Sequence, residues 1–458
     1  MKIPRILITA PKSGSGKTLI TCGILELLKR TGRNVSAFKC GPDYIDPMFH
    51  HHVQNVPGGN LDSFLMGQDG VRYSFAKHGR NSTAVLEGVM GYYDGSSSRN
   101  TSASSYEIAC LTDTPAILIV DARGAYLSAA AVVNGFAGFR KDSHIAGVLL
   151  NHTRGRVYES MKELIERETG VPVLGYVPEL KDCVLESRHL GLVLPDEVTG
   201  LSGQLASLCD TLAETIDLQS LLAIADRAPE IPESWLVSPF AGITAAARKR
   251  KRRIGLADDE AFCFYYRDNL ELLEESGASL VRFSPIHDKA LPEKLDGLLL
   301  YGGYPEIYAE ALSKNTEMRN AVRKAVLGGM HCIAECGGFL YLLEELEDLN
   351  GHSWPMAGVL KGRGYRTPHL TRFGYVNLEC GTVFGKDIGP LRAHEFHYFD
   401  AENCGTGFQA KKPESGRNWP CIYSTETLLA GFPHIHYYSR PEIAEQFLTV
   451  PPDENRKA

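Results

Sequence analysis

A glycine-rich segment near the N-terminus has residue types suited to binding phosphate groups. It spans Ala10–Thr18 (APKSGSGKT), after a short apolar run and before an amphipathic stretch. Backbone N–H groups of such a loop wrap phosphate oxygens, and the N-terminus of the following helix favours negative charge. Lys17 would reach the β- and γ-phosphates of a nucleotide, and Thr18 would ligate Mg²⁺. The alternative is a glycine turn that binds no nucleotide. We expect ATP to be bound by Lys12, Gly14, Ser15, Gly16, Lys17 and Thr18.

Acidic residues follow two further apolar runs. Asp43 and Asp46 come after the first, and Glu87 and Asp94 lie at the end of the second and just beyond it. Because ligands bind at the carboxyl ends of parallel strands, we expect these side chains beside the phosphate loop. ATP-bound Mg²⁺ takes a few oxygen ligands, and we expect Thr18, Asp43 and Glu87 to supply them. Taken one by one, such acidic residues are more often turn formers than ligands.

A cysteine in the second half of the chain has the setting of a nucleophile. Cys336 lies between an apolar run and a helix-like segment, in Ala334–Phe339 (AECGGF), as in a nucleophile elbow. A helix N-terminus stabilises a thiolate. The N–H groups near Gly303 can form an oxyanion hole, and His434 offers a general base. Alone, Cys336 would more often be a buried core residue. The combination predicts acyl transfer.

Short apolar runs alternate with longer amphipathic segments between these residues, which predicts two α/β domains built on parallel sheets. Strands are expected at Ile3–Thr9, Asn34–Lys39, Thr83–Glu87, Ala116–Asp121, Ile145–Asn151, Arg253–Ala257, Ser279–Phe283, Gly297–Leu300 and His331–Ala334. Helices are expected at Lys17–Thr31, Val157–Thr169, Asn269–Ser276, Met318–Gly328 and Phe339–Leu346.

A change of composition marks the expected domain boundary. Residues 226–252 contain three prolines and much of the basic run Arg248–Arg253. We expect a first domain at 1–225, a linker at 226–252 and a second domain at 253–458. The basic run is interpreted as a solvated segment, with a nuclear or nucleic-acid signal as the alternative.

Composition excludes several other classes of protein. The 458 residues are 43% hydrophobic and 22% charged, close to ordinary globular usage and unlike a disordered chain or a coiled coil. With 48 Lys and Arg against 55 Asp and Glu, the net charge of −7 gives no general attraction to nucleic acid or anionic membrane. The 45 glycines exceed average usage and cluster in loops, which indicates functional loops rather than repeats.

The cysteines indicate a cytoplasmic protein. Their number, 11, is odd and they are spread thinly, unlike a disulfide framework. The start of the sequence leads directly into an apolar strand and shows no signal peptide. We find no apolar stretch long enough to span a membrane, so no membrane partner is expected.

Several segments together resemble one family, the cobyrinate a,c-diamide synthases. The resemblance covers nearly the whole chain. The carriers are Ser13–Thr18, Lys39–Pro47, Glu87–Gly91, Asp259–Tyr266, Gly302–Glu306, Ala334–Gly338 and His394–Tyr398. It implies an N-terminal doubly wound P-loop domain like that of dethiobiotin synthetase. It also implies a C-terminal class I glutamine amidotransferase domain with a flavodoxin-like α/β fold. Lys12 itself resembles the extra lysine of a deviant Walker A group that includes the MinD-type ATPases, in which that lysine often acts across a homodimer.

The resemblance also implies roles for the residues of the second domain. Cys336 would attack the amide of L-glutamine, form a glutamyl thioester and release ammonia. The N–H groups of Gly303 and Gly337 would hold the oxyanion, and His434 would take the thiol proton. Related amidotransferases carry a glutamate two residues after this histidine. Here that position is His436, so the resemblance favours a Cys–His dyad.

In the first domain, the resemblance implies that ATP phosphorylates a carboxylate of cobyrinate and that ammonia converts the acyl phosphate to an amide. Asp43, Asp46, Glu87 and Asp94 would bind Mg²⁺, position the substrate or handle ammonia, without assignment among these roles. Asn151 would contact adenine.

The chain departs from the family pattern at Asp258 and Tyr301, and His152 replaces the commoner arginine. None of these departures removes a catalytic group. Two alternatives stay open at this stage. The same chemistry can act on hydrogenobyrinate or nickel-sirohydrochlorin, which the sequence does not separate from cobyrinate. A MinD-like ATPase switch is the alternative from a different class. It predicts an amphipathic membrane-binding tail, whereas the last residues here, Pro451–Ala458, are polar.

Overall fold

The computed structural model describes residues 1–53, 55–180, 187–188, 191–192, 198, 200–242 and 251–449. The chain forms two compact units, Met1–Ser238 and Pro239–Ala458. The division falls inside the expected linker 226–252. Part of that segment belongs to the first unit, because the N–H group of Ile231 donates to the carbonyl of Met1 (3.0 Å). Cys183, Arg248–Arg250 of the basic run and the C-terminal tail lie outside the described residues.

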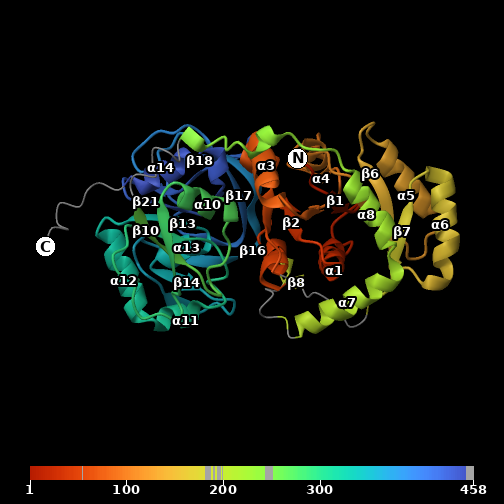
Figure 1. Ribbon diagram of the computed structural model, residues 1–458. Coiled ribbons are helices and arrows are strands. Elements are labelled where there is room, and N and C mark those ends of the chain that lie inside the picture. The colour runs from red at the N-terminus through yellow and green to blue at the C-terminus, as the bar shows by residue number, and fades with distance from the viewer. Residues whose placement is uncertain are drawn as a thin grey trace. The chain divides into compact units, whose positions relative to one another are not determined.

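The first unit is built on a parallel sheet (Figure 1). The strand order is β3-β2-β4-β1-β5-β6-β7, and the strands are β1 (Arg5–Thr9), β2 (Val35–Cys40), β3 (Gly58–Leu61), β4 (Thr83–Glu87), β5 (Ala116–Asp121), β6 (Ile145–Asn151) and β7 (Val173–Val177). The doubly wound fold expected from the sequence is confirmed. Because every pair in this sheet is parallel, the segments after β1, β2, β4 and β6 all emerge at one edge.

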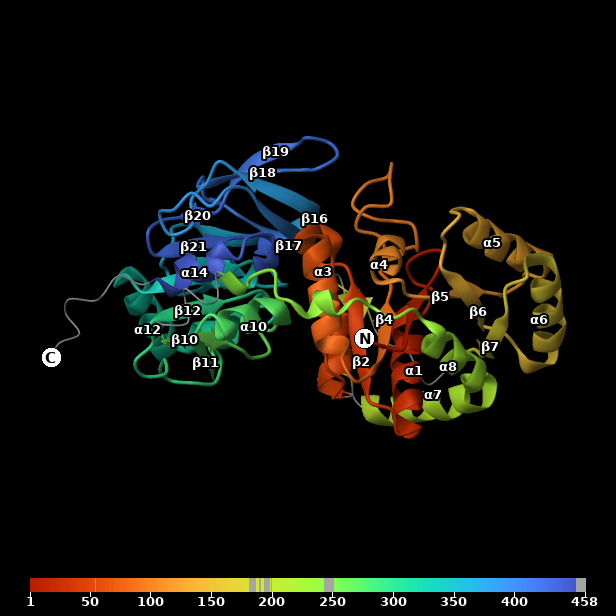
Figure 2. The ribbon, with the colours of Figure 1, turned by 45° about the horizontal axis from the view of Figure 1, so that its top comes forward.

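Helices cover the two faces of this sheet. They are α1 (Lys17–Arg30), α2 (Ile45–Met48), α3 (Ser63–Gly79), α4 (Ser105–Thr112), α5 (Leu127–Gly138), α6 (Gly155–Thr169), α7 (Leu201–Thr215) and α8 (Leu218–Arg227), with the π-helical turn η1 (Phe49–Val53), the 3₁₀ turn η3 (Glu233–Leu236) and the small hairpin β8 (Ser187–Arg188) and β9 (Gly191–Leu192). Figure 2 shows α1 beside α7, and these helices pack closely because residue 23 has no side chain. A Cβ atom at Gly23 would lie 2.4 Å from a side-chain carbon of Leu212.

We expect Gly58→Ala to destabilise the first unit. Strand β3 runs so close to β2 that a Cβ atom at residue 58 would lie 1.5 Å from the carbonyl oxygen of Ala37. Overpacking of this kind costs about 1–3 kcal/mol, measured as a lower denaturant midpoint for the first unit. The matched control is Gly135→Ala in α5, where a Cβ atom meets nothing within 4 Å. Equal midpoints for the two variants would contradict the expectation.

The second unit carries a six-stranded sheet in the order β11-β10-β12-β13-β21-β20. Its strands are β10 (Arg252–Ala257), β11 (Ala278–Phe283), β12 (Gly297–Leu300), β13 (His331–Glu335), β20 (Tyr423–Ser424) and β21 (Leu428–Gly431). Only β20 runs antiparallel to its neighbour. The helices are α10 (Arg267–Glu275), α11 (Ala309–Lys314), α12 (Thr316–Leu327), α13 (Gly337–Leu342) and α14 (Glu442–Leu448), with the 3₁₀ turn η5 (Tyr437–Ser439).

A second, mostly antiparallel sheet follows α13 and was not anticipated from the sequence. Its strands are β14 (Glu345–Glu347), β15 (Ser353–Pro355), β16 (Arg363–Glu379), β17 (Leu391–Ala401), β18 (Phe408–Lys411), β19 (Asn418–Cys421) and β22 (His434–Ile435). The expected helix Phe339–Leu346 is wrong in its second half. The carbonyl of Leu342 accepts N–H groups of Val359 and Leu360, which ends the helix and leaves Leu346 to pair in β14.

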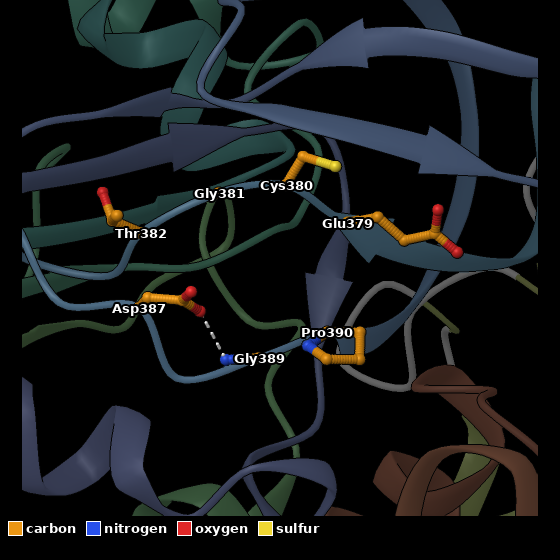
Figure 3. Close-up of a pocket in the computed structure, with 7 residues that line it drawn as sticks. All are labelled: Glu379, Cys380, Gly381, Thr382, Asp387, Gly389 and Pro390. Atoms are coloured by element: carbon orange, nitrogen blue, oxygen red, sulfur yellow. Dashed lines mark hydrogen bonds between the residues drawn. The ribbon is translucent and has the colours of Figure 1, made fainter.

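An open pocket lies where β16 leads into β17 (Figure 3). The N–H group of Gly389 donates to Asp387 (2.9 Å) inside it. The lining residues are Glu379, Cys380, Gly381, Thr382, Asp387, Gly389 and Pro390. No residue that we expected to take part in catalysis lines this pocket.

Candidate active sites

The phosphate loop has the backbone that its glycines predict. Gly14 and Gly16 have positive φ angles of 72° and 82°, and Gly16 caps the start of α1. Such angles are readily accessible only to glycine. The Ser15 hydroxyl donates to the carbonyl of Lys12 (2.9 Å), closing the loop on itself. Lys17 is therefore the first residue of helix α1, and the backbone N–H groups of the loop come directly before it in the sequence.

The side chain of Lys17 is held by backbone carbonyls. Its Nζ donates to Met90 (2.6 Å) and to Lys12 (3.2 Å). Burial, together with the nearby charge of Lys39, lowers the pKa of Lys17 to about 8. Nucleotide phosphates would supply the negative charge that these neutral carbonyls lack. The arrangement fits a lysine that binds phosphate.

Asn151 and Lys12 have local roles that the sequence did not indicate. The Asn151 amide donates to the carbonyl of Ser15 (3.0 Å) and accepts from the N–H group of His152 (2.9 Å). Both ends of this amide are thus engaged in supporting the loop, and contact with adenine stays a prediction. The Lys12 side chain is exposed while its carbonyl holds Ser15 and Lys17.

Glu87 is the centre of a buried polar cluster at the ends of β2 and β4. Its Oε1 accepts from the Thr18 hydroxyl (2.6 Å) and from Lys39 Nζ (2.8 Å). Its Oε2 lies 3.1 Å from Nε2 of His50. Burial alone would raise the pKa of Glu87, but Lys39 and His50 lower it below its usual range. Glu87 is therefore a carboxylate at neutral pH, adjacent to the proposed magnesium ligand Thr18.

Asp46 joins this cluster, and Asp43 lies at its rim. Asp46 forms an ion pair with Lys39. Burial lowers the pKa of Lys39, but Asp46 and Glu87 outweigh burial and raise it. Asp43 Oδ1 accepts the N–H groups of Ile45 (2.8 Å) and Asp46 (3.1 Å), so it holds the turn into α2. The structure brings Glu87 and Asp46 together around one lysine.

Asp94 is exposed and lies in the loop after β4. Its Oδ2 accepts the N–H group of Gly91 (3.2 Å). A Cβ atom at residue 91 would lie 2.4 Å from that oxygen, which explains the glycine there. The hydrogen bond of Asp94 stays within its own turn, but its charge acts on Lys17, so Asp94 lies near the phosphate loop without bonding to Glu87.

Sequence reasoning missed Lys39 and His50 as members of this site. Lys39 is the penultimate residue of an apolar strand and is 4% exposed, and a lysine in such a run is the signal that could have identified it. His50 gave a weaker signal, one of three adjacent histidines. Its π-helical turn is a type that often marks functional sites.

The oxygen donors present fit a magnesium ion bound together with a nucleotide. The Thr18 hydroxyl and the Glu87 carboxylate are hard ligands 2.6 Å apart. Over the described ranges, no group of three or more His, Cys, Asp or Glu side chains is arranged to hold a metal ion. Mg²⁺ needs no all-protein cage, because it usually keeps waters and binds substrate phosphates beside one or two protein ligands.

In the second unit, Cys336 occupies a tight turn between β13 and α13. Its φ and ψ angles are 49° and −102°, a strained conformation for a residue with a side chain. Its N–H group donates to Gly431 (2.8 Å), and the N–H group of Gly338 donates to Tyr301 (2.9 Å). The turn is therefore fixed to the strands on either side, as a nucleophile elbow requires.

Gly303 and Gly337 lie against each other beside this thiol. A Cβ atom at Gly337 would lie 3.1 Å from the backbone nitrogen of Gly303. A Cβ atom at Gly303 would lie 2.1 Å from the carbonyl oxygen of Ala261. A side chain would be crowded at both positions, and the backbone nitrogen of Gly303 lies close to Gly337, the residue that follows Cys336. The geometry suits an oxyanion hole.

His434 lies in β22, three residues after the end of β21, which is the strand that contacts the elbow. Its ring edge abuts Gly302, where a Cβ atom would lie 2.5 Å from Cε1. On the other side, Nδ1 lies 3.7 Å from Oε2 of Glu335. Burial lowers the pKa of His434 to about 3, so the resting imidazole is neutral and able to accept a proton.

The resting thiol differs from the expectation for a helix N-terminus. Burial raises the pKa of Cys336, and the carboxylates of Glu306 and Glu395 raise it further. The N–H group of Gly337 lowers it, but burial outweighs this effect. Cys336 is therefore a neutral thiol at rest, and a base such as His434 is needed to activate it.

The two units together define the class of this protein. Residues 6–192 match the family described as "CobQ/CobB/MinD/ParA nucleotide binding domain". Residues 253–441 match the family described as "CobB/CobQ-like glutamine amidotransferase domain". With the P-loop fold of the first unit and the amidotransferase fold of the second, this is an ATP-binding, amide-forming ligase that uses glutamine.

Curated relatives specify the family. A cobyrinate a,c-diamide synthase of Listeria innocua is 40% identical over 96% of this chain and 98% of its own. One of Dehalococcoides mccartyi strain 195 is 38% identical over 98% of each chain. The chain belongs to the cobyrinate a,c-diamide synthase family, whose members act in cobalamin biosynthesis. Among solved structures, a glutamine amidotransferase covers 43% of this chain and 97% of its own, at 21% identity and a TM-score of 0.32.

None of the helices in the described ranges has the length and hydropathy of a membrane span. Full-length similarity to amide-forming enzymes accounts for the second unit, which the MinD-like ATPase switch would leave unexplained.

Proposed function

We propose that this chain amidates the a and c acetate carboxylates of cobyrinate with ATP and glutamine. The observation that carries the proposal is the elbow thiol Cys336 beside the closely spaced Gly303 and Gly337, in the same chain as a P-loop whose Thr18 donates a hydrogen bond to Glu87. A chain that carries both a glutaminase site and a nucleotide site has the two sites that a glutamine-dependent ligase needs. Cobyrinate is the substrate in the names of the relatives.

In the glutaminase reaction, the Cys336 thiol gives its proton to His434 and its sulfur attacks the glutamine amide carbon. The N–H groups of Gly303 and Gly337 stabilise the oxyanion. Collapse of this intermediate breaks the carbon–nitrogen bond, and ammonia leaves with the proton from His434. Water then hydrolyses the thioester to glutamate and restores the thiol.

In the synthetase reaction, a substrate carboxylate oxygen attacks the γ-phosphorus of ATP, and ADP leaves. This activation is needed because a carboxylate at neutral pH is a poor electrophile. Ammonia attacks the acyl phosphate carbon, phosphate leaves and an amide forms. Lys17 stabilises the transferring phosphoryl group. Mg²⁺, held by Thr18 and Glu87 with Asp43 as a further candidate, would neutralise phosphate charge.

The cluster around Glu87 supports a role in positioning the substrate. Lys39 is the buried cation of this cluster and pairs with both Asp46 and Glu87, so it is the positive charge that an incoming substrate carboxylate would meet. Asp94, at the exposed rim, stays a candidate for substrate or ammonia handling. We further propose a cytoplasmic enzyme, with a homodimer in which the exposed Lys12 reaches a second subunit.

An assay of the purified protein tests the proposal. Cobyrinate, hydrogenobyrinate and nickel-sirohydrochlorin are each incubated with ATP, Mg²⁺ and glutamine, and amide formation is followed by mass spectrometry. We expect two amides on cobyrinate and two equivalents of ADP and glutamate. Preference for another of the three would change the substrate, and amidation of none would refute the function.

A further inference from the structure

The general base of the glutaminase has an acidic neighbour that the sequence did not indicate. The position two residues after His434 is another histidine, His436, which left a Cys–His dyad as the expectation. The structure instead places the residue directly before the nucleophile, Glu335, next to His434. We propose that Glu335 is the positioning residue for His434 and completes a Cys336–His434–Glu335 triad. The inference rests on the proposed glutaminase function and deepens it.

Both oxygens of the Glu335 carboxyl group face the segment that carries His434. Oε2 lies 3.7 Å from Nδ1 of His434, and Oε1 accepts the backbone N–H group of Ile435 (3.3 Å). The two side chains are only 5% and 3% exposed. At the end of β13, Glu335 is opposite Gly431 of the adjacent strand β21, from which the chain continues to His434. The register of β13 and β21 therefore brings the two side chains together.

The orientation of the imidazole follows from Gly302. A Cβ atom at residue 302 would lie 2.5 Å from Cε1 and 3.4 Å from Nε2 of His434. The Nε2 edge thus faces the loop that contains Gly303, while Nδ1 faces Glu335. In a triad, one ring nitrogen exchanges the proton of the nucleophile and the other is fixed by an acid. Nδ1 of His434 has the acid Glu335 beside it, whereas Nε2 lies on the side of Gly302.

His436 is engaged elsewhere. Its Nδ1 accepts the N–H group of Tyr438 (3.2 Å), which starts the turn η5. Its ring packs at 4.8 Å from that of Tyr266 and at 5.2 Å from that of Tyr438. These contacts give His436 a structural role in its own turn.

A carboxylate beside His434 would stabilise the positive charge that His434 carries after it takes the thiol proton. A base must carry a positive charge after it takes the thiol proton, and burial opposes that charge. Glu335 is the acidic group that the structure places in ion-pair range of His434 among the described residues. Burial also raises the pKa of Glu335, which disfavours its carboxylate until an imidazolium forms beside it and balances the charge.

The other titratable groups around the pair do not supply this charge. Tyr301 and Tyr437 face Glu335 and are hydrogen-bonded to each other (2.8 Å). His394 and His397 face His434 and would only oppose a positive charge. Glu306 and Glu395 raise the pKa of the Cys336 thiol, and Glu335 adds a smaller effect in the same direction. Of the groups around the pair, Glu335 is thus the one placed to favour the imidazolium.

The test compares Glu335→Gln with the full-length wild type. Glutaminase kcat and KM, ammonia-dependent amidation and the pH dependence of Cys336 alkylation by iodoacetamide are measured, the last by mass spectrometry of the Cys336 peptide. We expect kcat to fall about 10- to 100-fold, with KM changed by less than about threefold and ammonia-dependent amidation kept. In this variant the Cys336 thiolate and His434 imidazolium no longer have the Glu335 carboxylate beside them. The pH midpoint of Cys336 alkylation should therefore rise by about one unit.

Two further variants separate positioning from a structural effect. His436→Gln is the matched control and should keep the wild-type alkylation midpoint. Glu335→Asp keeps the charge but is one methylene shorter, so its kcat and midpoint should fall between those of wild type and Glu335→Gln. If Glu335→Gln does not fold, judged by lost ammonia-dependent amidation, Glu335→Asp decides alone. The inference is overturned if the folded Glu335→Gln variant keeps the alkylation midpoint and the kcat of the wild type. The proposed function is overturned instead if the wild-type protein has no glutaminase activity.

Discussion

Cys336→Ser should lose glutamine-dependent amidation at least about a thousandfold while amidation with added ammonia continues. The elbow backbone at Cys336 accepts serine without new atoms, so the fold is expected to stay intact. A serine hydroxyl is a much poorer nucleophile than a thiol in this setting, because Cys336 depends on a neutral His434 for activation. The P-loop unit is unchanged in this variant, so ammonia supplied from solution still meets the acyl phosphate.

The measurement is amide formation with glutamine and, separately, with ammonium chloride at alkaline pH, where more free ammonia is present. Cys380→Ser is the matched control, since Cys380 is an exposed thiol of the same unit and should behave as wild type. Retention of glutamine use by Cys336→Ser would remove Cys336 from the mechanism. Equal loss with both nitrogen donors would indicate a folding defect or a different role.

The second large effect is expected for Lys17→Ala, which should reduce amidation at least about a hundredfold with either nitrogen donor. The Lys17 ammonium donates to the carbonyls of Met90 and Lys12. With ATP bound, it is the cation placed to stabilise charge on the transferring phosphoryl group. Alanine leaves the loop backbone in place but removes that cation.

Glutamine hydrolysis by itself should survive in Lys17→Ala, because Cys336 and His434 belong to the other unit. ADP release, amide formation and glutamate release are therefore measured in parallel. Lys29→Ala, an exposed lysine in the last turn of the same helix α1, is the matched control and should match wild type in all three. Normal amidation by Lys17→Ala would show that the P-loop does not serve the synthetase reaction.

Much of the fold could be predicted from short stretches of sequence. Strands β4, β5, β6 and β12 have the bounds expected from their apolar runs. The glycine loop before α1 and the elbow at Cys336 also stand where the sequence placed them. In each case a few adjacent residues suffice, because a buried parallel strand needs only a short apolar run and a tight turn needs only its glycines.

The antiparallel sheet of the second unit shows where local reasoning stops. The run Phe339–Leu346 is apolar except for Glu344 and Glu345, and so short a pattern does not separate helix from strand. Leu346 lies in a strand because it pairs with Trp354 and Gly364, and both partners come later in the chain. Interactions of this kind override local propensity.

The sequence by itself determined the two chemistries of this protein: a phosphate loop with Lys17 and Thr18, and a thiol with a later histidine. Only the tertiary structure decided their partners. Glu87 meets Lys39 and His50 because β2 and β4 are neighbours in the sheet. Glu335 meets His434 because β13 pairs with β21, across about a hundred residues of chain. Spacing along a chain specifies a turn, but contacts between distant residues depend on strand order and register, which no local pattern contains.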